Sequence, residues 1–132
     1  MSDPLFLTLD EVLAIHASRI ELYGGSLGIR DVHVLESALA MSKAQFGGQY
    51  LHASIEEMAA AYLFHIARNH PFLDGNKRTA LGATIAFLGL NRLWLEAPGE
   101  ELVDLVQRTA KGELTKAEIA VFLKKHVRRL RT

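Results

Sequence analysis

Two apolar segments of helical length, separated by a short polar stretch, constrain the fold of this chain more than any other feature. The first runs from Ser54 to about Asn69 and is nearly apolar all round after Met58; the second runs from about Lys77 to Leu90. A helix that is apolar on every side belongs inside a protein. The two segments therefore predict a pair of buried central helices, joined by the polar stretch.

Capping boxes indicate where three helices begin. In each box a hydroxyl can accept a hydrogen bond from a first-turn amide, and a glutamate three residues later can reach back to the cap amide. The boxes pair Thr8 with Glu11, Ser54 with Glu57, and Thr115 with Glu118. Helical spacing and glycine breaks predict helices at about 9–22, from an Asp31 cap to about 44, and at about 100–110, with 92–95 as a short extended piece. We therefore expect an all-α, single-domain bundle of about six helices over residues 1–132.

Composition excludes several classes of protein. An apolar fraction of 49% over 132 residues is too high for a disordered chain and sufficient for one compact core. With no cysteine, neither a disulfide framework nor a thiolate zinc site can form. The beginning of the chain does not resemble a signal peptide, and no apolar run is long enough to span a membrane. We expect a cytoplasmic protein without membrane contact.

Charge is balanced overall but unevenly distributed. The chain has 15 basic and 15 acidic side chains, which argues against a protein held directly on nucleic acid by bulk charge. Residues 123–132 hold five of the bases and no acid, so the remainder has 10 bases against 15 acids, a balance of −5. These five are Lys124, Lys125, Arg128, Arg129 and Arg131. They fit either the solvated face of a last helix, where cations suit the helix dipole, or a surface for an acidic partner.

The polar stretch at residues 70–78 carries an unusual set of side chains. Pro71 is expected to end the first apolar helix, and Gly75 allows the chain to turn with its amides free. The next helix then begins, and its unpaired N–H groups and positive dipole end favour an anion. Lys77 and Arg78 add positive charge at the same place. This arrangement predicts a cradle for a phosphate group.

Two further side chains of this stretch suit transfer chemistry. Asp74 lies just before the cradle, where a carboxylate beside phosphates commonly holds Mg²⁺. His70 ends the first helix, where a neutral imidazole can remove a proton from an incoming hydroxyl. Taken singly, each group has an ordinary explanation: a helix cap, a turn and a solvated basic pair. Their combination between two buried helices predicts phosphoryl or nucleotidyl transfer.

The same stretch resembles the signature of the Fic/Doc family, His-x-Phe-x-Asp/Glu-Gly-Asn-Gly/Lys-Arg. Here it is His70-Pro71-Phe72-x-Asp74-Gly75-Asn76-Lys77-Arg78. The continuation Thr79-Ala80-Leu81 resembles the Doc branch, the death-on-curing toxins of toxin–antitoxin systems. So do Tyr23-Gly24-Gly25, Gly28-Ile29-Arg30-Asp31 and Leu35-Glu36-Ser37-Ala38-Leu39 before the motif, and Phe87-Leu88-x-Leu90-Asn91 after it. The resemblance covers nearly the whole chain.

This resemblance implies a helical fold and an ATP-dependent modification of a hydroxyl on a target protein. The roles implied are base for His70, Mg²⁺ ligand for Asp74, anion-hole turn for Gly75 and Asn76, and phosphate contact for Lys77 and Arg78. Arg68 corresponds to an arginine of Doc that aids phosphate binding, although a solvated arginine at a helix end explains it equally.

The connection from Gly24 to Arg30 corresponds, in the same resemblance, to a flap that docks the target segment. The docking residues implied are Gly25, Ser26, Leu27, Gly28 and Ile29. A plain connection between two helices is the alternative interpretation.

Departures from the family pattern favour phosphoryl transfer over AMP transfer. Fic enzymes that transfer AMP end their motif Gly-Arg-x-x-Arg, and the final arginine grips the γ-phosphate. This chain has Lys77 in place of that glycine and Leu81 in place of that arginine. Doc also lacks the arginine and resembles a kinase that offers the γ-phosphate. Gly75 and Gly82 depart from Doc, which has Ala and Asn there, so AMP transfer stays an alternative.

Other functions fit the sequence less well. The intact His70 and Asp74 argue against a catalytically silent nucleotide-binding module. The histidines lack the paired spacing of a metal hydrolase, and His65 suits a core position. A nuclease would need an acid cluster and a basic groove. The Fic inhibitory pattern Ser/Thr-x-x-x-Glu-Gly/Asn fails at residues 109–114. The resemblance therefore implies control by a separate antitoxin, and it suggests elongation factor Tu as the target.

Overall fold

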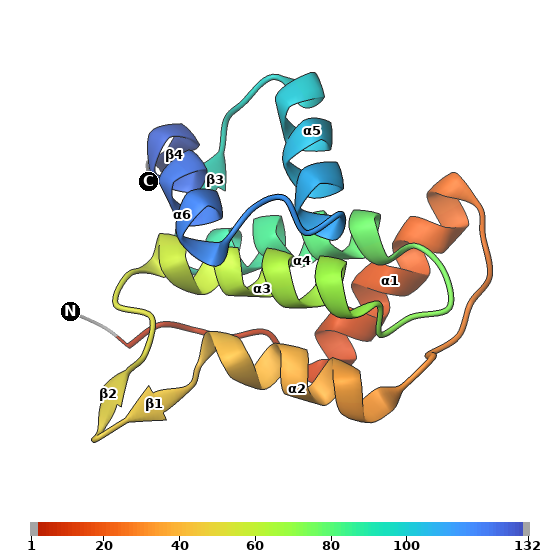
Figure 1. Ribbon diagram of the computed structural model, residues 1–132, viewed down its shortest axis with the longest axis horizontal. Helices are drawn as coiled ribbons and strands as arrows, with labels where there is room; N and C mark the ends of the chain where they lie inside the picture. Colours follow the sequence, from red (N-terminus) through yellow and green to blue (C-terminus); the bar gives the residue numbers. More distant parts are fainter. Residues whose placement is uncertain (1–2, 131–132) are drawn as a thin grey trace.

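The computed structural model describes residues 3–130, which form six α-helices and two small antiparallel sheets (Figure 1). The helices are α1 (Leu9–Tyr23), α2 (Val32–Ser42), α3 (Ile55–Asn69), α4 (Asn76–Leu90), α5 (Gly99–Ala110) and α6 (Lys116–His126). The strands are β1 (Gln45–Phe46), β2 (Gln49–Tyr50), β3 (Leu93–Leu95) and β4 (Val127–Arg129). The expected all-α class is confirmed. Within residues 3–130, no helix is long and apolar enough to cross a membrane.

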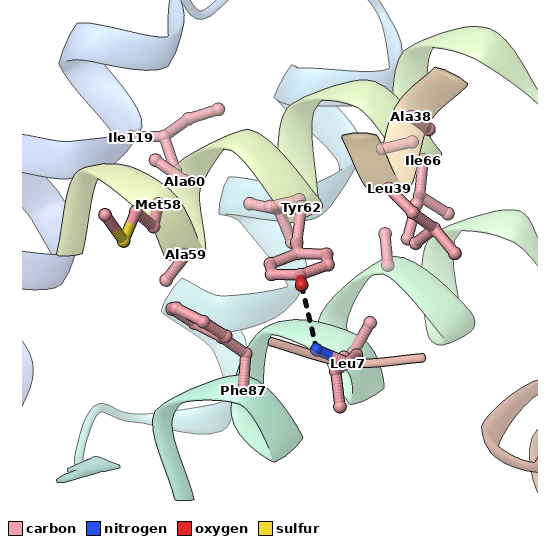
Figure 2. Close-up of a cluster of buried hydrophobic side chains, with 14 of the residues drawn as sticks. Leu7, Ala38, Leu39, Met58, Ala59, Ala60, Tyr62, Ile66, Phe87 and Ile119 are labelled. Atoms are coloured by element: carbon pink, nitrogen blue, oxygen red, sulfur yellow. Dashed lines mark hydrogen bonds between the residues drawn. The ribbon is translucent and has the colours of Figure 1, made fainter. Parts of the chain in front are cut away.

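The two apolar segments form the central helices, as the sequence predicts. α3 and α4 pack against each other, with α5 and α6 above the pair and α2 below it in the view of Figure 1. Eight residues of α3 are buried, half of them alanines, and such small side chains let neighbouring helices approach closely. Tyr62 of α3 and Phe87 of α4 are fully buried in the core, with ring centroids 5.0 Å apart (Figure 2).

A hydrogen bond ties the segment before α1 to the central helix. The buried amide of Leu7 donates to the hydroxyl oxygen of Tyr62 over 3.1 Å (Figure 2). Burial raises the pKa of the Tyr62 hydroxyl to about 12. The tyrosine therefore anchors the beginning of the chain across the core.

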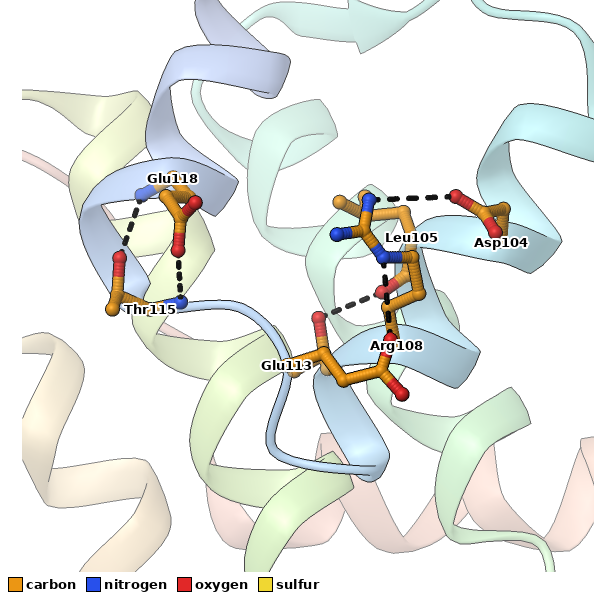
Figure 3. Close-up of polar contacts among 7 residues, drawn as sticks. Asp104, Leu105, Arg108, Glu113, Thr115 and Glu118 are labelled. Atoms are coloured by element: carbon orange, nitrogen blue, oxygen red, sulfur yellow. Dashed lines mark hydrogen bonds and ion pairs between the residues drawn. The ribbon is translucent and has the colours of Figure 1, made fainter.

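Side chains cap the starts of four helices: α1, α2, α3 and α6. The Asp31 carboxylate caps α2, as the sequence predicts, by accepting from the amides of His33 and Val34. The boxes at the starts of α1 and α6 form completely, and Figure 3 shows the second, between Thr115 and Glu118. The box before α3 differs from the expectation. The Ser54 hydroxyl accepts from the Glu57 amide over 3.1 Å, but the Glu57 carboxylate accepts from the amide of Ala53. The glutamate therefore bonds to the residue that precedes the N-cap Ser54, in place of the Ser54 amide that a capping box would use.

The connection after α2 differs from the sequence prediction. α2 ends at Ser42 instead of about residue 44, and a small hairpin follows where the sequence predicts only a break. Gly47 and Gly48 form its turn with φ of 61° and 81°. Two successive positive φ values are what a tight hairpin turn requires, and glycine adopts them readily.

The basic C-terminal residues do not all lie on a helix, which corrects one of the two interpretations. Lys124 and Lys125 occupy the last turn of α6, but Arg128 and Arg129 lie on β4, which pairs with β3. Arg131 lies outside the described residues. The helix-face interpretation therefore holds for the two lysines only, because backbone pairing with β3 extends the chain after α6.

Candidate active site

Residues 70–75 form the loop between α3 and α4, at the same end of the molecule as the connection that follows α1 (Figure 1). His70 is the C-cap of α3 and has left-handed backbone angles, φ 49° and ψ 59°. Phe72 is 1% exposed, so its side chain points inward. Gly75, with φ 75°, is the N-cap of α4. The loop thus begins and ends on a left-handed residue.

The connection between α1 and α2, which we call the flap (residues 24–31), pairs with this loop through its backbone. The Leu73 amide donates to the Gly28 carbonyl over 3.1 Å, and the Arg30 amide donates to the Pro71 carbonyl over 2.8 Å. Position 28 requires glycine, because φ is 141° and a Cβ would lie 2.7 Å from Leu73 Cδ1. The flap is therefore fixed against the loop.

The side chain of Arg30 caps the end of α3. Its Nη2 donates to the Asn69 carbonyl over 2.8 Å, and its Nε donates to the His70 carbonyl over 2.5 Å. The last carbonyls of a helix have no partner within the helix, and a cation suits the negative end of the helix dipole. From the sequence, Arg30 is only the end of the connection and a member of the Gly28-Ile29-Arg30-Asp31 run that resembles Doc. No local pattern could indicate a contact with residues about forty positions away.

The imidazole of His16, on α1, contacts both the backbone and a side chain of the loop. Its side chain is 3% exposed, and its Nε2 lies 2.8 Å from the Asp74 carbonyl. A carbonyl only accepts, so Nε2 carries the proton. The imidazole also stacks on Phe72, with ring centroids 3.8 Å apart and planes within 6°. Helical spacing places His16 on the apolar face of the first helix. A buried imidazole needs a hydrogen-bond partner, and this need is the signal in the sequence that could indicate the contact.

The side chain of Asn76 closes the loop on itself. Its Oδ1 accepts from the Phe72 amide over 2.9 Å, and its Nδ2 donates to the Phe72 carbonyl over 3.0 Å. Gly75 supplies no side chain, and none among residues 3–130 caps the start of α4. The first amides of α4 are therefore available to an anion, as the sequence predicts for a phosphate cradle.

The carboxylate of Asp74 lies between the loop and the flap. Its Oδ1 accepts from the Gly75 amide over 2.9 Å, and its Oδ2 accepts from the Ser26 amide over 3.3 Å. Among residues 3–130, no three histidine or acidic side chains gather as a metal site. Mg²⁺ is commonly held by one or two carboxylates together with phosphate oxygens, so a single carboxylate beside the cradle fits an ion shared with a nucleotide.

A cavity of about 610 Å³ opens beside the loop, which is within the usual range of ligand pockets. Its motif side is lined by His70, Leu73, Asp74, Gly75, Asn76, Lys77, Arg78 and Leu81. The α5 side is lined by Val103, Val106, Gln107 and Ala110. The cavity thus has a polar end built by the motif and an apolar end built by Leu81 and α5.

Comparison with known proteins agrees with this geometry. A model of the Fic/DOC family matches residues 6–88. The chain is a member of the Fic/Doc family. It is 33% identical over 117 residues to Protein kinase doc of Escherichia phage P1, across 88% of this chain and 90% of that protein. It is 41% identical over 75 residues to Toxin Doc of Mycolicibacterium smegmatis, across 57% of this chain and 58% of that protein. Both relatives place it on the Doc branch.

The structure brings together most of the residues that the Fic/Doc resemblance implies. The six from the motif, His70, Asp74, Gly75, Asn76, Lys77 and Arg78, line one cavity. Arg68 lies elsewhere: its guanidinium sits 5.7 Å from the centroid of the Phe64 ring and beside Gly112, where a Cβ would lie 2.7 Å from Nη1. This position corresponds to the solvated helix-end arginine that the sequence also allows.

The flap of this Fic/Doc protein contacts the motif directly. Ser26 and Gly28 bond to it through their backbone, and Ile29 forms an isolated antiparallel bridge with Phe72. Leu27 is exposed on the surface. The flap is thus an extended segment held against the active-site loop.

Arg78 of the Fic/Doc motif packs on the end of α1. Its guanidinium carbon lies 4.6 Å from the centroid of the Tyr23 ring, and its Nη1 donates to the Tyr23 carbonyl over 3.4 Å. An arginine side chain has five N–H donors, so this contact leaves others for a phosphate. Lys77 is exposed and lines the cavity.

Proposed function

We propose that this protein is a toxin that transfers the γ-phosphate of ATP to a hydroxyl of a target protein, and so arrests translation. The composition of the cavity carries this proposal. AMP-transferring Fic enzymes grip the γ-phosphate with an arginine, and Leu81 stands at that position, on the apolar side of the cavity. An apolar wall suits a nucleobase better than a phosphate, so the γ-phosphate is favoured at the basic motif end.

The names of the relatives support the same function. The phage protein is called a protein kinase, and the mycobacterial protein is called a toxin. The phage relative aligns over most of both chains, which includes the whole motif and the flap.

In the proposed reaction, the hydroxyl oxygen of the target attacks the γ-phosphorus, the bond to the bridging oxygen breaks, and ADP leaves. His70 accepts the proton of the hydroxyl. The amides that follow Gly75, together with Lys77 and Arg78, stabilise the charge on the transferred group. Mg²⁺ held by Asp74 and phosphate oxygens would supply further charge neutralisation.

AMP transfer is the second candidate, and Gly75 is the observation that favours it. AMP-transferring enzymes have glycine here, whereas Doc has alanine. In this chain Gly75 has φ 75°, and a Cβ would lie 3.0 Å from Ile20 Cδ1. The backbone at this position is thus suited to glycine, as in the AMP-transferring motif. A silent nucleotide-binding module is the third candidate.

Two labels distinguish the candidates. The protein is incubated with Mg²⁺, cytosolic extract and ATP labelled at either the α- or the γ-phosphate. We expect transfer of the γ-label alone; transfer of the α-label would replace the proposal by AMP transfer. His70→Ala should abolish transfer, and His33→Ala, which changes an exposed histidine on α2, should not. If wild type transfers neither label and expression leaves growth unaffected, the silent module is the better explanation.

The proposed partners are elongation factor Tu as target and a cognate antitoxin, both in the cytoplasm. The basic residues at the end of α6 and on β4 offer a surface for an acidic antitoxin segment. Pull-down of the antitoxin by an Arg128→Ala, Arg129→Ala double variant tests this surface. Unchanged antitoxin binding would eliminate it without bearing on the transfer reaction.

A further inference from the structure

One residue of the flap holds three consecutive carbonyls at the end of α3. Arg30 donates from Nη2 to the Asn69 carbonyl over 2.8 Å and from Nε to the His70 carbonyl over 2.5 Å. Its backbone amide donates to the Pro71 carbonyl over 2.8 Å. The backbone on both sides of the His70 α-carbon is therefore fixed by a residue forty positions earlier in the chain.

The backbone of His70 needs such support. Among residues 3–130, the non-glycine residues with positive φ are His70, at 49°, and Arg92, at 65°. The left-handed region costs free energy for any residue with a Cβ, and helices that end there usually have glycine at that place. A histidine keeps this conformation only where its surroundings impose it. The Nε of Arg30 supplies such a constraint, because it donates to the His70 carbonyl.

The guanidinium is the side chain that suits this task. Its planar fork can donate to two neighbouring carbonyls at once, which the single ammonium of lysine cannot do with the same geometry. Its charge also lies at the C-terminal end of α3, where the helix dipole favours a cation. The two carbonyl contacts are exposed, so water can replace Arg30 as a donor. Replacement should therefore change the direction of His70 more than the stability of the fold.

We propose that Arg30 is a positioning residue that sets the direction of the His70 imidazole toward the cavity. The inference rests on the proposed function, because His70 acts there as the base. The inference goes beyond the proposed function by giving the flap a second role. Through Arg30 and Gly28 the same segment is bonded to the loop on either side of Pro71. A flap displaced from the loop would release the base as well.

Three variants test the proposal: Arg30→Gln, Arg30→Lys and, as a control, Arg108→Gln. Arg108 is an exposed arginine on α5 that pairs with Asp104 and Glu113 and does not line the cavity (Figure 3). In the γ-label assay, Arg30→Gln should lower kcat about 10- to 100-fold, the range expected when a catalytic group is misplaced by about an ångström. Its KM for ATP should stay within about twofold, because Arg30 lies outside the cavity lining. Arg30→Lys should lose nearly as much kcat as Arg30→Gln, and Arg108→Gln should equal wild type.

A spectroscopic measurement separates positioning from other roles. In protein labelled with ¹³C and ¹⁵N at histidine, Arg30→Gln should shift or broaden the His70 signals, while those of His33 and His126 stay unchanged. This measurement needs no reaction, so it decides the inference even if wild type transfers no label. Unchanged His70 signals would overturn the proposal, and a loss of kcat beside them would assign Arg30 to target contact instead. If Arg30→Gln fails to fold, Arg30→Lys is measured in the same way.

Discussion

The buried imidazole of His16 fixes the Asp74 peptide, and the turn into α4 depends on that peptide. Glutamine can reach the same carbonyl with an N–H donor, whereas leucine fills the space and leaves the carbonyl without it. We predict that His16→Leu destabilises the protein by about 1 kcal/mol, the lower end of the usual cost of an unpaired polar group, because the contact is only partly buried. It should also lower γ-phosphate transfer. His16→Gln should retain most of both properties, as measured by urea unfolding and label transfer.

The matched control is His33→Leu, because the side chain of His33 is 92% exposed on α2. It should change stability by less than about 0.5 kcal/mol. If His16→Gln were as inactive and as unstable as His16→Leu, the hydrogen bond to Asp74 would not be the property that matters.

Two neighbouring glycines in the flap allow a second test at single residues. Gly24 and Gly25 both have positive φ, of 84° and 114°. A Cβ on Gly25 would lie 2.6 Å from Asp74 Oδ2, whereas one on Gly24 would meet no described atom within 4 Å. Both alanine variants therefore strain the backbone, but only Gly25→Ala displaces the carboxylate.

We predict that Gly25→Ala raises the Mg²⁺ concentration needed for half-maximal transfer several-fold, because its Cβ pushes away the proposed metal ligand. Gly24→Ala should stay within about twofold of wild type in the same titration, since it shares the strain without the clash. Equal Mg²⁺ dependence in the two variants would contradict a metal role for Asp74.

At the scale of elements, the sequence predicts the helices well because their signals are local. Caps, helical spacing and glycine breaks give all six helices and the buried pair. The hairpin after α2 and the strand after α6 are missed, because strands of two or three residues depend on a partner elsewhere in the chain. For the same reason, only some of the site residues could be predicted from the sequence. His70 and Asp74 belong to one continuous motif, whereas His16 and Arg30 reach it only through the tertiary fold.

The hydrogen bond between Leu7, before α1, and Tyr62 of α3 also depends on the tertiary fold, and it can be tested. Tyr62→Phe removes the oxygen that accepts from the buried Leu7 amide and leaves the ring packed on Phe87. We predict a loss of about 1–3 kcal/mol in the free energy of unfolding, because the amide keeps no partner. Tyr50→Phe, on the half-exposed β2, should cost much less. Urea unfolding of both variants decides this, and equal losses would refute the anchoring role of Tyr62.

At the scale of the whole molecule, α6 is held on α3 partly through groups that titrate. Lys116, the first residue of α6, lies with its Nζ 3.1 Å from the Nε2 of His65 on α3. Burial, followed by the charge of Lys116, lowers the pKa of His65 from 6.5 to about 4. Burial and the same lysine also lower the pKa of His52, while Glu57 acts in the opposite direction. The contact between Lys116 and His65 therefore requires a neutral His65.

The sign of the pH dependence follows from these pKa values. Between about pH 6.5 and pH 4 the unfolded chain binds a proton at His65 that the folded protein does not, so stability falls as the pH falls through this range. In a site fully shielded from solvent, a lowering of the pKa by this amount would correspond to about 3 kcal/mol in the free energy of unfolding. His65 is only partly buried, so solvent screening reduces the expected effect to about 1 kcal/mol.

We therefore predict that the free energy of unfolding in urea is lower at pH 5.0 than at pH 7.5, and that His65→Gln removes about 1 kcal/mol of that difference. Glutamine keeps an oxygen that can accept from Lys116 but has no group that titrates in this range. A remaining dependence in the same direction is expected from His52. His33→Gln serves as the control, because the exposed His33 should leave the pH dependence unchanged. If His65→Gln and His33→Gln keep the same pH dependence as wild type, the neutral His65 does not stabilise the packing of α6 on α3.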